Sequence, residues 1–271
     1  MARARRNKTS QPSRLRDLTL EKLIPNIITV SAACAGLTAI RFAIESRWDH
    51  AVAAILLAAV LDGLDGGMAR LLKATSDFGA QLDSLFDILS FGVAPALVLY
   101  FWSLQHLGGI GWALALFLVV CCGLRLARFN TMLGKQPPHT KGFFSGVPAP
   151  AGGLLALLPI VLWLGFDLSI MYHPLVVGGW AIVMASLMVS RIPTYSFKGL
   201  KVPQPYVLPV LILAALFFAG LAGSPWLTLT IASGLYLATF PISRRSYRRL
   251  VAAAKEAGRE TDDDTRQRQI P

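Results

Sequence analysis

Long apolar blocks separated by short polar links dominate the sequence and restrict the folds that are open to it. A helix that crosses the hydrocarbon layer of a membrane needs about 20 largely apolar residues. Eight blocks suit this role, at residues roughly 25–45, 50–70, 79–103, 108–130, 147–166, 173–190, 205–222 and 226–243. Hydrophobic residues make up 54% of the chain and charged residues only 15%, well below the charged fraction of a soluble domain. The sequence therefore predicts an all-α integral membrane protein with eight helices.

The polar residues divide the chain into four predicted segments. Residues 1–24 form a basic N-terminal segment, and residues 25–190 form a membrane core of six helices. Residues 191–243 hold a polar, proline-bearing link and two further membrane helices, and residues 244–271 form a basic and then acidic tail. The stretch Arg14–Leu23 mixes leucines with basic residues, which fits either a short helix on anionic lipid or a disordered tail.

Basic residues mark one side of the membrane. If the N-terminus is cytoplasmic, eight helices put all but Arg41 and Arg47 of the 26 Lys and Arg residues on the cytoplasmic side. Cytoplasmic loops carry such an excess, so we expect both termini and the loop between the second and third helices to be cytoplasmic. The net charge of +11 forms no stripe with interleaved aromatic residues, so we expect membrane lipids as partners and no nucleic acid.

Four aspartates occupy the facing ends of the second and third predicted helices, where ionisable side chains are costly and usually functional. Asp62 and Asp65 share one helix face by their i, i+3 spacing, and Asp83 and Asp87 share another by their i, i+4 spacing. A short turn through Lys73–Phe78 would make the two helices antiparallel neighbours. We therefore expect the four carboxylates to converge.

Converging carboxylates repel one another unless cations neutralise them. Ligands that are all oxygen atoms, without His or Cys, favour Mg²⁺, Mn²⁺ or Ca²⁺. Two ions about 4 Å apart would suit phosphoryl transfer. Gly66, Ala69 and Gly79 leave room for a nucleotide on these faces, although Gly63 and Gly67 also form a G-x-x-x-G helix-packing pair. The alternative for acids inside a membrane is the ion pathway of a transporter.

The segment from Asp62 to Asp87 reads DGLDGGMARLLKATSDFGAQLDSLFD. It matches the signature D-x2-D-G-x2-A-R-x8-G-x3-D-x3-D at every defined position, and so resembles the CDP-alcohol phosphatidyltransferase family. Pro25, Asn26 and Thr29 resemble the opening of the first helix in this family. Leu124–Asn130 and Phe144–Gly152 resemble its phosphatidylserine synthase branch. The resemblance covers roughly residues 20–205, and the last two helices are similar to those of bacterial members of that branch.

The resemblance implies a six-helix catalytic core, commonly in a homodimer, with a site open to the cytoplasm and the membrane. It implies two divalent cations, Mg²⁺ or Mn²⁺, held at positions matching Asp62, Asp65, Asp83 and Asp87, with Asp87 as the general base. It also implies a CDP site at Asp65, Gly66, Ala69, Arg70, Gly79 and Asp83. Asn26 and Thr29 are further candidates for this site, with capping of the first helix as the alternative.

The reaction expected from the resemblance is transfer of a phosphatidyl group from CDP-diacylglycerol to L-serine, with release of CMP. Glycerol 3-phosphate or inositol phosphate is the alternative acceptor. Arg128, and after it Arg125, are candidates for the serine carboxylate, because a guanidinium fork suits a carboxylate. Anchoring of the fourth helix at the cytoplasmic side would also explain these arginines. Ser145, in the loop Lys135–Pro150, is a further candidate for the acceptor pocket.

Overall fold

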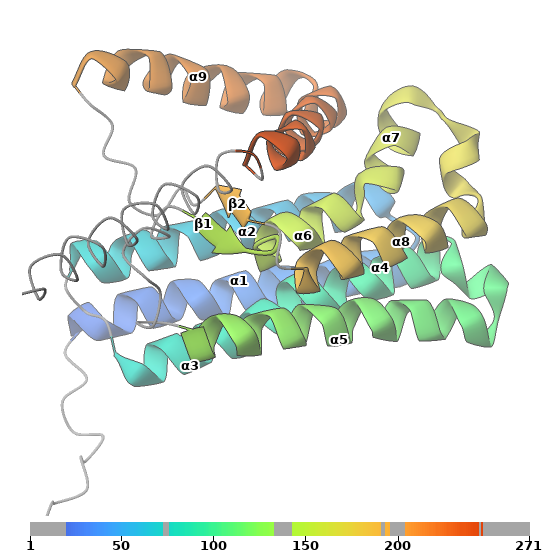
Figure 1. Ribbon diagram of the computed structural model, residues 1–271, viewed down its shortest axis with the longest axis horizontal. Coiled ribbons are helices and arrows are strands. Elements are labelled where there is room, and N and C mark those ends of the chain that lie inside the picture. Colours follow the sequence, from blue (N-terminus) through green and yellow to red (C-terminus); the bar gives the residue numbers. More distant parts are fainter. Residues whose placement is uncertain are drawn as a thin grey trace, which may run out of the picture.

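The computed structural model describes residues 20–72, 76–132, 143–190, 193–195, 204–243 and 245. The expectations for the basic N-terminal segment before residue 20, for much of the loop Lys135–Pro150 and for the tail after residue 245 lie outside these residues. The chain begins with α1 (Leu20–Ile44) and α2 (Trp48–Leu71), which pack side by side (Figure 1). Both correspond to predicted membrane helices.

The third span is one helical rod with a change of repeat in its middle. It consists of α3 (Asp77–Asp87), the π-helix η1 (Ile88–Val93) and α4 (Ala94–Trp102). The hydroxyl of Ser76 caps α3 by accepting a hydrogen bond from the Gly79 backbone N–H at 3.0 Å. The predicted helix 79–103 is thus present as a span, but its spacing gave no sign of the π-helical turn.

The following helices complete the bundle. After the short η2 (Leu104–Leu107) come α5 (Gly109–Met132), α6 (Ala149–Ala156), α7 (Leu158–Phe166), η4 (Ser169–Tyr172) and α8 (Pro174–Val189). The axes of α6 and α7 differ by 45°. Pro159 near the start of α7 has no backbone N–H to donate, which interrupts the helical hydrogen bonds at the bend.

A short antiparallel ribbon lies at the end of the bundle. It pairs β1 (Phe143–Ser145) with β2 (Pro193–Tyr195), with Phe144 opposite Thr194. The helical expectation for this protein contained no strand. Each strand has only three residues, too few for a hydrophobic repeat to be recognised in the sequence.

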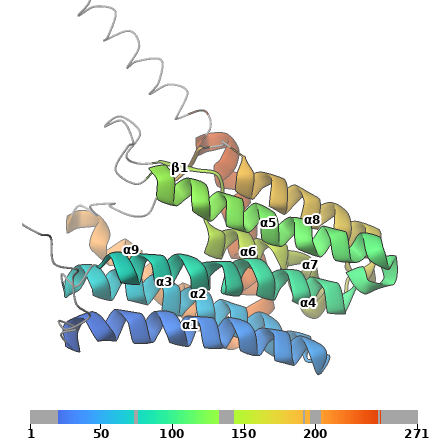
Figure 2. The same ribbon diagram turned by 90° about the horizontal axis from the view of Figure 1, so that it is seen from below.

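The last two described helices lie on one side of the bundle (Figures 1 and 2). They are α9 (Gln204–Gly223) and an unlabelled C-terminal helix, Pro225–Ser243. None of the apolar window of α9 is buried in the protein. The C-terminal helix instead packs against the core through partly buried side chains that include Trp226, Tyr236 and Phe240.

Six described helices are long and apolar enough to cross a membrane, and the bent pair α6–α7 makes a seventh if it is one span. The chain is therefore an integral membrane protein with an almost entirely helical fold. The predicted helix at 173–190 exists as α8, but its 16 residues are fewer than the about 20 that a membrane crossing needs. The structure thus supports six or seven spans by length and composition rather than the predicted eight.

The position of α2 relative to α3, the two helices that carry the aspartates, depends on their packing against α1. α1 packs against α2, α3 and α4, so α2 and α3 share it as a common partner. The buried core beyond the site consists mainly of small and aliphatic residues, with Phe91 and Trp102 as its largest aromatic members. Small residues let helices approach closely in a membrane, where packing rather than hydrophobic burial drives their association.

Candidate metal and nucleotide site

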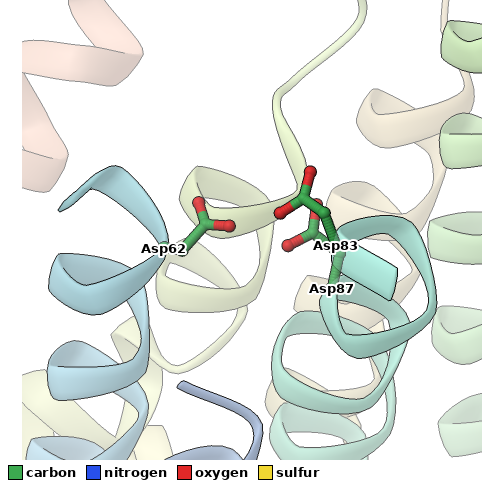
Figure 3. A group of neighbouring side chains, drawn as sticks. All are labelled: Asp62, Asp83 and Asp87. Carbon is green, nitrogen blue, oxygen red and sulfur yellow. The ribbon is translucent and has the colours of Figure 1, made fainter. Parts of the chain in front are cut away.

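Three aspartates meet across the gap between α2 and α3. Asp62 comes from α2, and Asp83 and Asp87 come from α3, one turn apart (Figure 3). One carboxylate oxygen of each lies within 4.8 Å of those of the other two. The expected convergence of these acids is therefore present in the fold.

Asp65 takes a different position from these three. It is only 5% exposed, and its Oδ2 accepts a hydrogen bond from the Thr29 hydroxyl of α1 at 2.6 Å. The same hydroxyl lies 3.0 Å from the carbonyl oxygen of Pro25. An i, i+3 spacing separates two side chains by about 60° around a helix, so Asp62 and Asp65 need not point to one place. Asp65 turns to α1, which sequence spacing could not reveal.

A pocket of about 140 Å³ opens beside the three acids. Its walls come from the cytoplasmic-side ends predicted for the first three helices, and it includes seven of the eight residues expected at the CDP site. These are Asn26, Thr29, Asp65, Gly66, Ala69, Gly79 and Asp83. Pro25, Ser76 and Ala80 also line it. Asp83 belongs to both the pocket and the three-acid cluster, so the two features are contiguous.

The two pocket glycines have different roles. A Cβ at Gly79 would lie 3.1 Å from both the Asn26 Oδ1 and the Ser76 Oγ, so the start of α3 closely approaches α1. A Cβ at Gly66 would meet no atom within 4 Å. Gly79 therefore allows α3 to approach α1 closely, whereas Gly66 leaves space in the pocket that a side chain would fill.

Three lining residues were missed by sequence reasoning. Ser76 precedes α3 as its N-cap, and a Ser before a helix is a recognisable start signal that could have identified it. Pro25 and Ala80 line the pocket because α1 and α3 pack together, and no local pattern indicates this.

Arg70 lies apart from the pocket walls. Its side chain is exposed, and its Nε donates a hydrogen bond to the Gly66 carbonyl oxygen at 2.9 Å. The Arg70 side chain thus lies along α2 and contacts the backbone one turn before its own position. Of the residues expected at the CDP site, it is the one that does not line the cavity.

The two arginines considered for the acceptor differ in their surroundings. Arg125 on α5 is 9% exposed, close enough to Asp87 and Asp62 for their charges to interact. Its Cζ lies 5.4 Å from the ring centroid of Phe129. Arg128 is more exposed and donates from Nη1 to the Val189 carbonyl oxygen at the end of α8, at 3.3 Å.

Two further residues come from the segments Leu124–Asn130 and Phe144–Gly152. The Asn130 Nδ2 of α5 donates to the Ser84 Oγ of α3 at 2.9 Å, which ties these helices together beside Asp83. Ser145 ends strand β1, opposite Pro193. The side chain of Ser145 lies outside the described part of the structure.

The donor atoms of the cluster fit a hard divalent cation. Asp62, Asp83 and Asp87 offer carboxylate oxygens, the ligand type that Mg²⁺, Mn²⁺ and Ca²⁺ prefer. Three such groups within 4.8 Å of one another can hold a cation, which would neutralise the repulsion between their charges. The arrangement is suited to chemistry at a phosphate that occupies the adjoining pocket.

Comparison with known proteins is consistent with this geometry. The family described as CDP-alcohol phosphatidyltransferase matches residues 22–192, and CDP-alcohol phosphatidyltransferase 2 matches residues 205–241. A CDP-diacylglycerol–serine O-phosphatidyltransferase of Mycobacterium leprae (strain TN) is 39% identical over 246 residues, covering 90% of this chain and 81% of the relative. The protein of the same name from Helicobacter pylori (strain J99) is 35% identical over 221 residues, covering 79% of this chain and 88% of the relative.

Proposed function

The chain belongs to the CDP-alcohol phosphatidyltransferase family, and we propose that it transfers the phosphatidyl group of CDP-diacylglycerol to L-serine, releasing CMP. It is a membrane-embedded transferase of phospholipid synthesis. The family match gives the donor class, and the names of relatives that are 35–39% identical over most of the chain give serine as the acceptor.

The single observation that carries this function is the shared position of Asp83. This residue lines the pocket and also belongs to the three-acid cluster. A nucleotide in the pocket would therefore hold its pyrophosphate beside the cluster. Gly66 and Ala69 form a wall without bulky side chains, against which a nucleotide can lie closely.

The reaction exchanges one phosphorus–oxygen bond for another. The serine hydroxyl oxygen attacks the phosphorus that bears diacylglycerol, and the bond from that phosphorus to the CMP oxygen breaks. The proton of the serine hydroxyl passes to the Asp87 carboxylate, which is the general base of the proposal. The products are phosphatidylserine and CMP.

Asp62, Asp65, Asp83 and Asp87 are the proposed ligands of two divalent cations, Mg²⁺ or Mn²⁺. When bound, such cations supply positive charge beside the pyrophosphate. Asp62, Asp83 and Asp87 already lie close enough to share an ion. Asp65 is held to α1 by Thr29 and forms the pocket side of the set. Arg70 reaches the nucleotide in this proposal only if its side chain leaves the Gly66 carbonyl.

We assign the serine carboxylate to the arginines of α5. Arg125 is the stronger candidate, because its buried guanidinium interacts with the charge of the proposed base Asp87. An arginine there can bring the carboxylate of serine to the side of the site where its hydroxyl must be deprotonated. Arg128 and Ser145 remain further candidates for this pocket.

The proposed orientation puts both termini and the site in the cytoplasm, with α8 included as an eighth crossing. Its basis is the charge distribution, because Arg41 and Arg47 are then the two basic residues on the opposite side. Both lie near Glu45, with Nε of Arg41 at 2.8 Å and Nη1 of Arg47 at 3.8 Å from its carboxylate. A homodimer, common in the family, completes the proposal.

One assay tests the proposed function. Purified protein in lipid nanodiscs is given CDP-diacylglycerol and Mg²⁺ or Mn²⁺, with each candidate acceptor in turn, and CMP release is measured. Release is expected with L-serine and not with glycerol 3-phosphate or inositol phosphate. Release with one of those two acceptors would replace serine in the proposal. No release with any acceptor would favour the alternative of an ion-coupled transporter.

Thr29→Val tests the contact between α1 and Asp65. Valine keeps the shape of threonine but cannot donate a hydrogen bond, so the buried Asp65 carboxylate loses the hydrogen bond from residue 29. Hydrogen bonds to charged groups contribute about 1.5–3 kcal/mol, so we expect the KM for CDP-diacylglycerol to rise about tenfold or more. Thr29→Ser keeps the hydroxyl and should stay within about threefold of the original KM. A KM in Thr29→Val equal to that of the unmodified protein would argue against a role of this bond in the pocket.

A further inference from the structure

The helix that carries Asp83 and Asp87 changes its repeat directly after Asp87. In η1, Ile88–Val93, backbone hydrogen bonds run from residue i to i+5 instead of i+4. Such a turn accommodates one additional residue, which corresponds to about 100° of rotation at 3.6 residues per turn. The direction in which α3 points its aspartates is therefore tied to η1.

Two neighbouring helices touch the backbone of η1 directly. A Cβ at Gly36 of α1 would lie 2.8 Å from the Cα of Ser90. A Cβ at Gly153 of α6 would lie 2.9 Å from the carbonyl oxygen and 3.0 Å from the Cα of Phe91. Real Cβ atoms essentially never come closer than 3.0 Å, so no other residue fits at Gly36 or Gly153 unless the backbone of η1 moves.

A third contact comes from α5. A Cβ at Gly92 would lie 3.2 Å from the Cβ of Cys122 on α5.

α1 makes a further, polar contact with η1. The Ser90 Oγ lies 3.4 Å from the Ala32 carbonyl oxygen of α1, at the limit of a hydrogen bond. Ser90, Phe91 and Gly92 are all buried, so α1, α5 and α6 enclose this turn.

We propose that η1 is the positioning element of the acid cluster, because its contacts with α1, α5 and α6 fix the rotation of α3 so that Asp83 and Asp87 face Asp62. This inference rests on the proposed function, since it takes the cluster to be the cation site. The physical need for such an element is clear. Three carboxylates that repel one another would separate if α3 were free to turn, and rigid packing holds them together before a cation arrives. Gly36, Gly92 and Gly153 are positioning residues in this account, since none of them lines the pocket or belongs to the cluster.

The test is Mn²⁺ affinity of glycine-to-alanine variants. Each purified variant in nanodiscs is titrated with Mn²⁺ alone, and free Mn²⁺ is followed by electron paramagnetic resonance without any substrate. In Gly36→Ala and Gly153→Ala the added methyl displaces the backbone of η1 and turns α3. We expect the Kd for Mn²⁺ to rise at least tenfold in each, with a changed spectrum of the bound ion.

Gly178→Ala is the matched control. A Cβ at Gly178 of α8 would lie 2.9 Å from the Leu114 Cδ1, a tight contact with the end of a side chain away from η1. We expect this variant to bind Mn²⁺ as the unmodified protein does, because the end of a leucine side chain can move aside without displacing the backbone of η1. An equal loss of Mn²⁺ affinity in Gly178→Ala would overturn the inference, because general loosening of the bundle would then explain all three variants.

A milder variant guards against failure to fold. Gly92→Ala introduces a contact of 3.2 Å with a cysteine side chain, which a small shift can relieve. We expect its Kd for Mn²⁺ to rise about threefold. The inference would be overturned if every variant of Gly36, Gly92 and Gly153 that folds bound Mn²⁺ with unchanged affinity. The proposed function would remain intact in that case. Absence of Mn²⁺ binding in the unmodified protein would instead overturn the cation site of the proposed function, and this inference with it.

Discussion

Asp87→Asn is expected to lower turnover with L-serine by about a thousandfold, within the range of 10²–10⁴ that general-base catalysis contributes. The amide cannot accept the proton of the serine hydroxyl. Asp87 is a proposed cation ligand but is not among the residues that line the pocket, so the KM for CDP-diacylglycerol should change far less than turnover does. Steady-state kinetics of CMP release, together with direct binding of CDP-diacylglycerol, would measure both effects.

Two comparison variants make the Asp87 result specific. Asp83→Asn should weaken both turnover and CDP-diacylglycerol binding, because Asp83 belongs to the pocket as well as to the cluster. Asp167→Asn is the matched control: Asp167 ends α7 at φ 51°, a left-handed conformation that Asn also adopts readily. Near-normal turnover in Asp87→Asn would remove this residue from the role of base.

Arg125→Gln is expected to raise the KM for L-serine about a hundredfold. Truncating one partner of a buried, hydrogen-bonded charge pair typically costs 2–5 kcal/mol, and about 2.7 kcal/mol corresponds to a hundredfold change. Glutamine retains much of the length of arginine but lacks its charge, so the serine carboxylate would lose its cation. The KM for CDP-diacylglycerol should change much less, because Arg125 does not line the pocket of α1, α2 and α3.

The comparison with Arg128 distinguishes recognition from anchoring. Arg128→Gln removes the donor to the Val189 carbonyl, so we expect a lower unfolding temperature and a smaller rise in the KM for serine. Arg41→Gln, at the opposite end of α1 beside Glu45, should leave both KM values unchanged. An Arg125→Gln enzyme with an unaltered KM for serine would transfer the acceptor role to Arg128 or to the segment around Ser145.

Much of the fold could be predicted because each membrane helix corresponds to one continuous apolar stretch of the sequence. Continuous apolar length identifies them, and α1, α2, α5 and α9 begin and end within a few residues of the predicted limits, apart from the start of α1. The predicted helix at 173–190 also matches α8 to within one residue at each end. The bend between α6 and α7 was not predicted, because hydropathy measures composition over a window and does not record a change of helix direction inside it.

The sequence by itself determined the chemistry of the site. The i, i+4 spacing of Asp83 and Asp87 places both on one face of a helix. The short connection to the preceding helix brings this face close to Asp62. Carboxylates in an apolar segment also predict a cation, since an isolated charge there is too costly. These conclusions depend on helical periodicity and charge, which are local properties.

Only the tertiary structure decided which neighbours each side chain meets. The hydrogen bond from Thr29 to Asp65, the position of Pro25 in the pocket wall and the burial of Arg125 all depend on how the helices pack together. The π-helical turn after Asp87 likewise forms where Gly36 and Gly153 allow two backbones to approach η1. Such contacts join residues far apart in the chain, and their energies depend on close packing that no local pattern encodes.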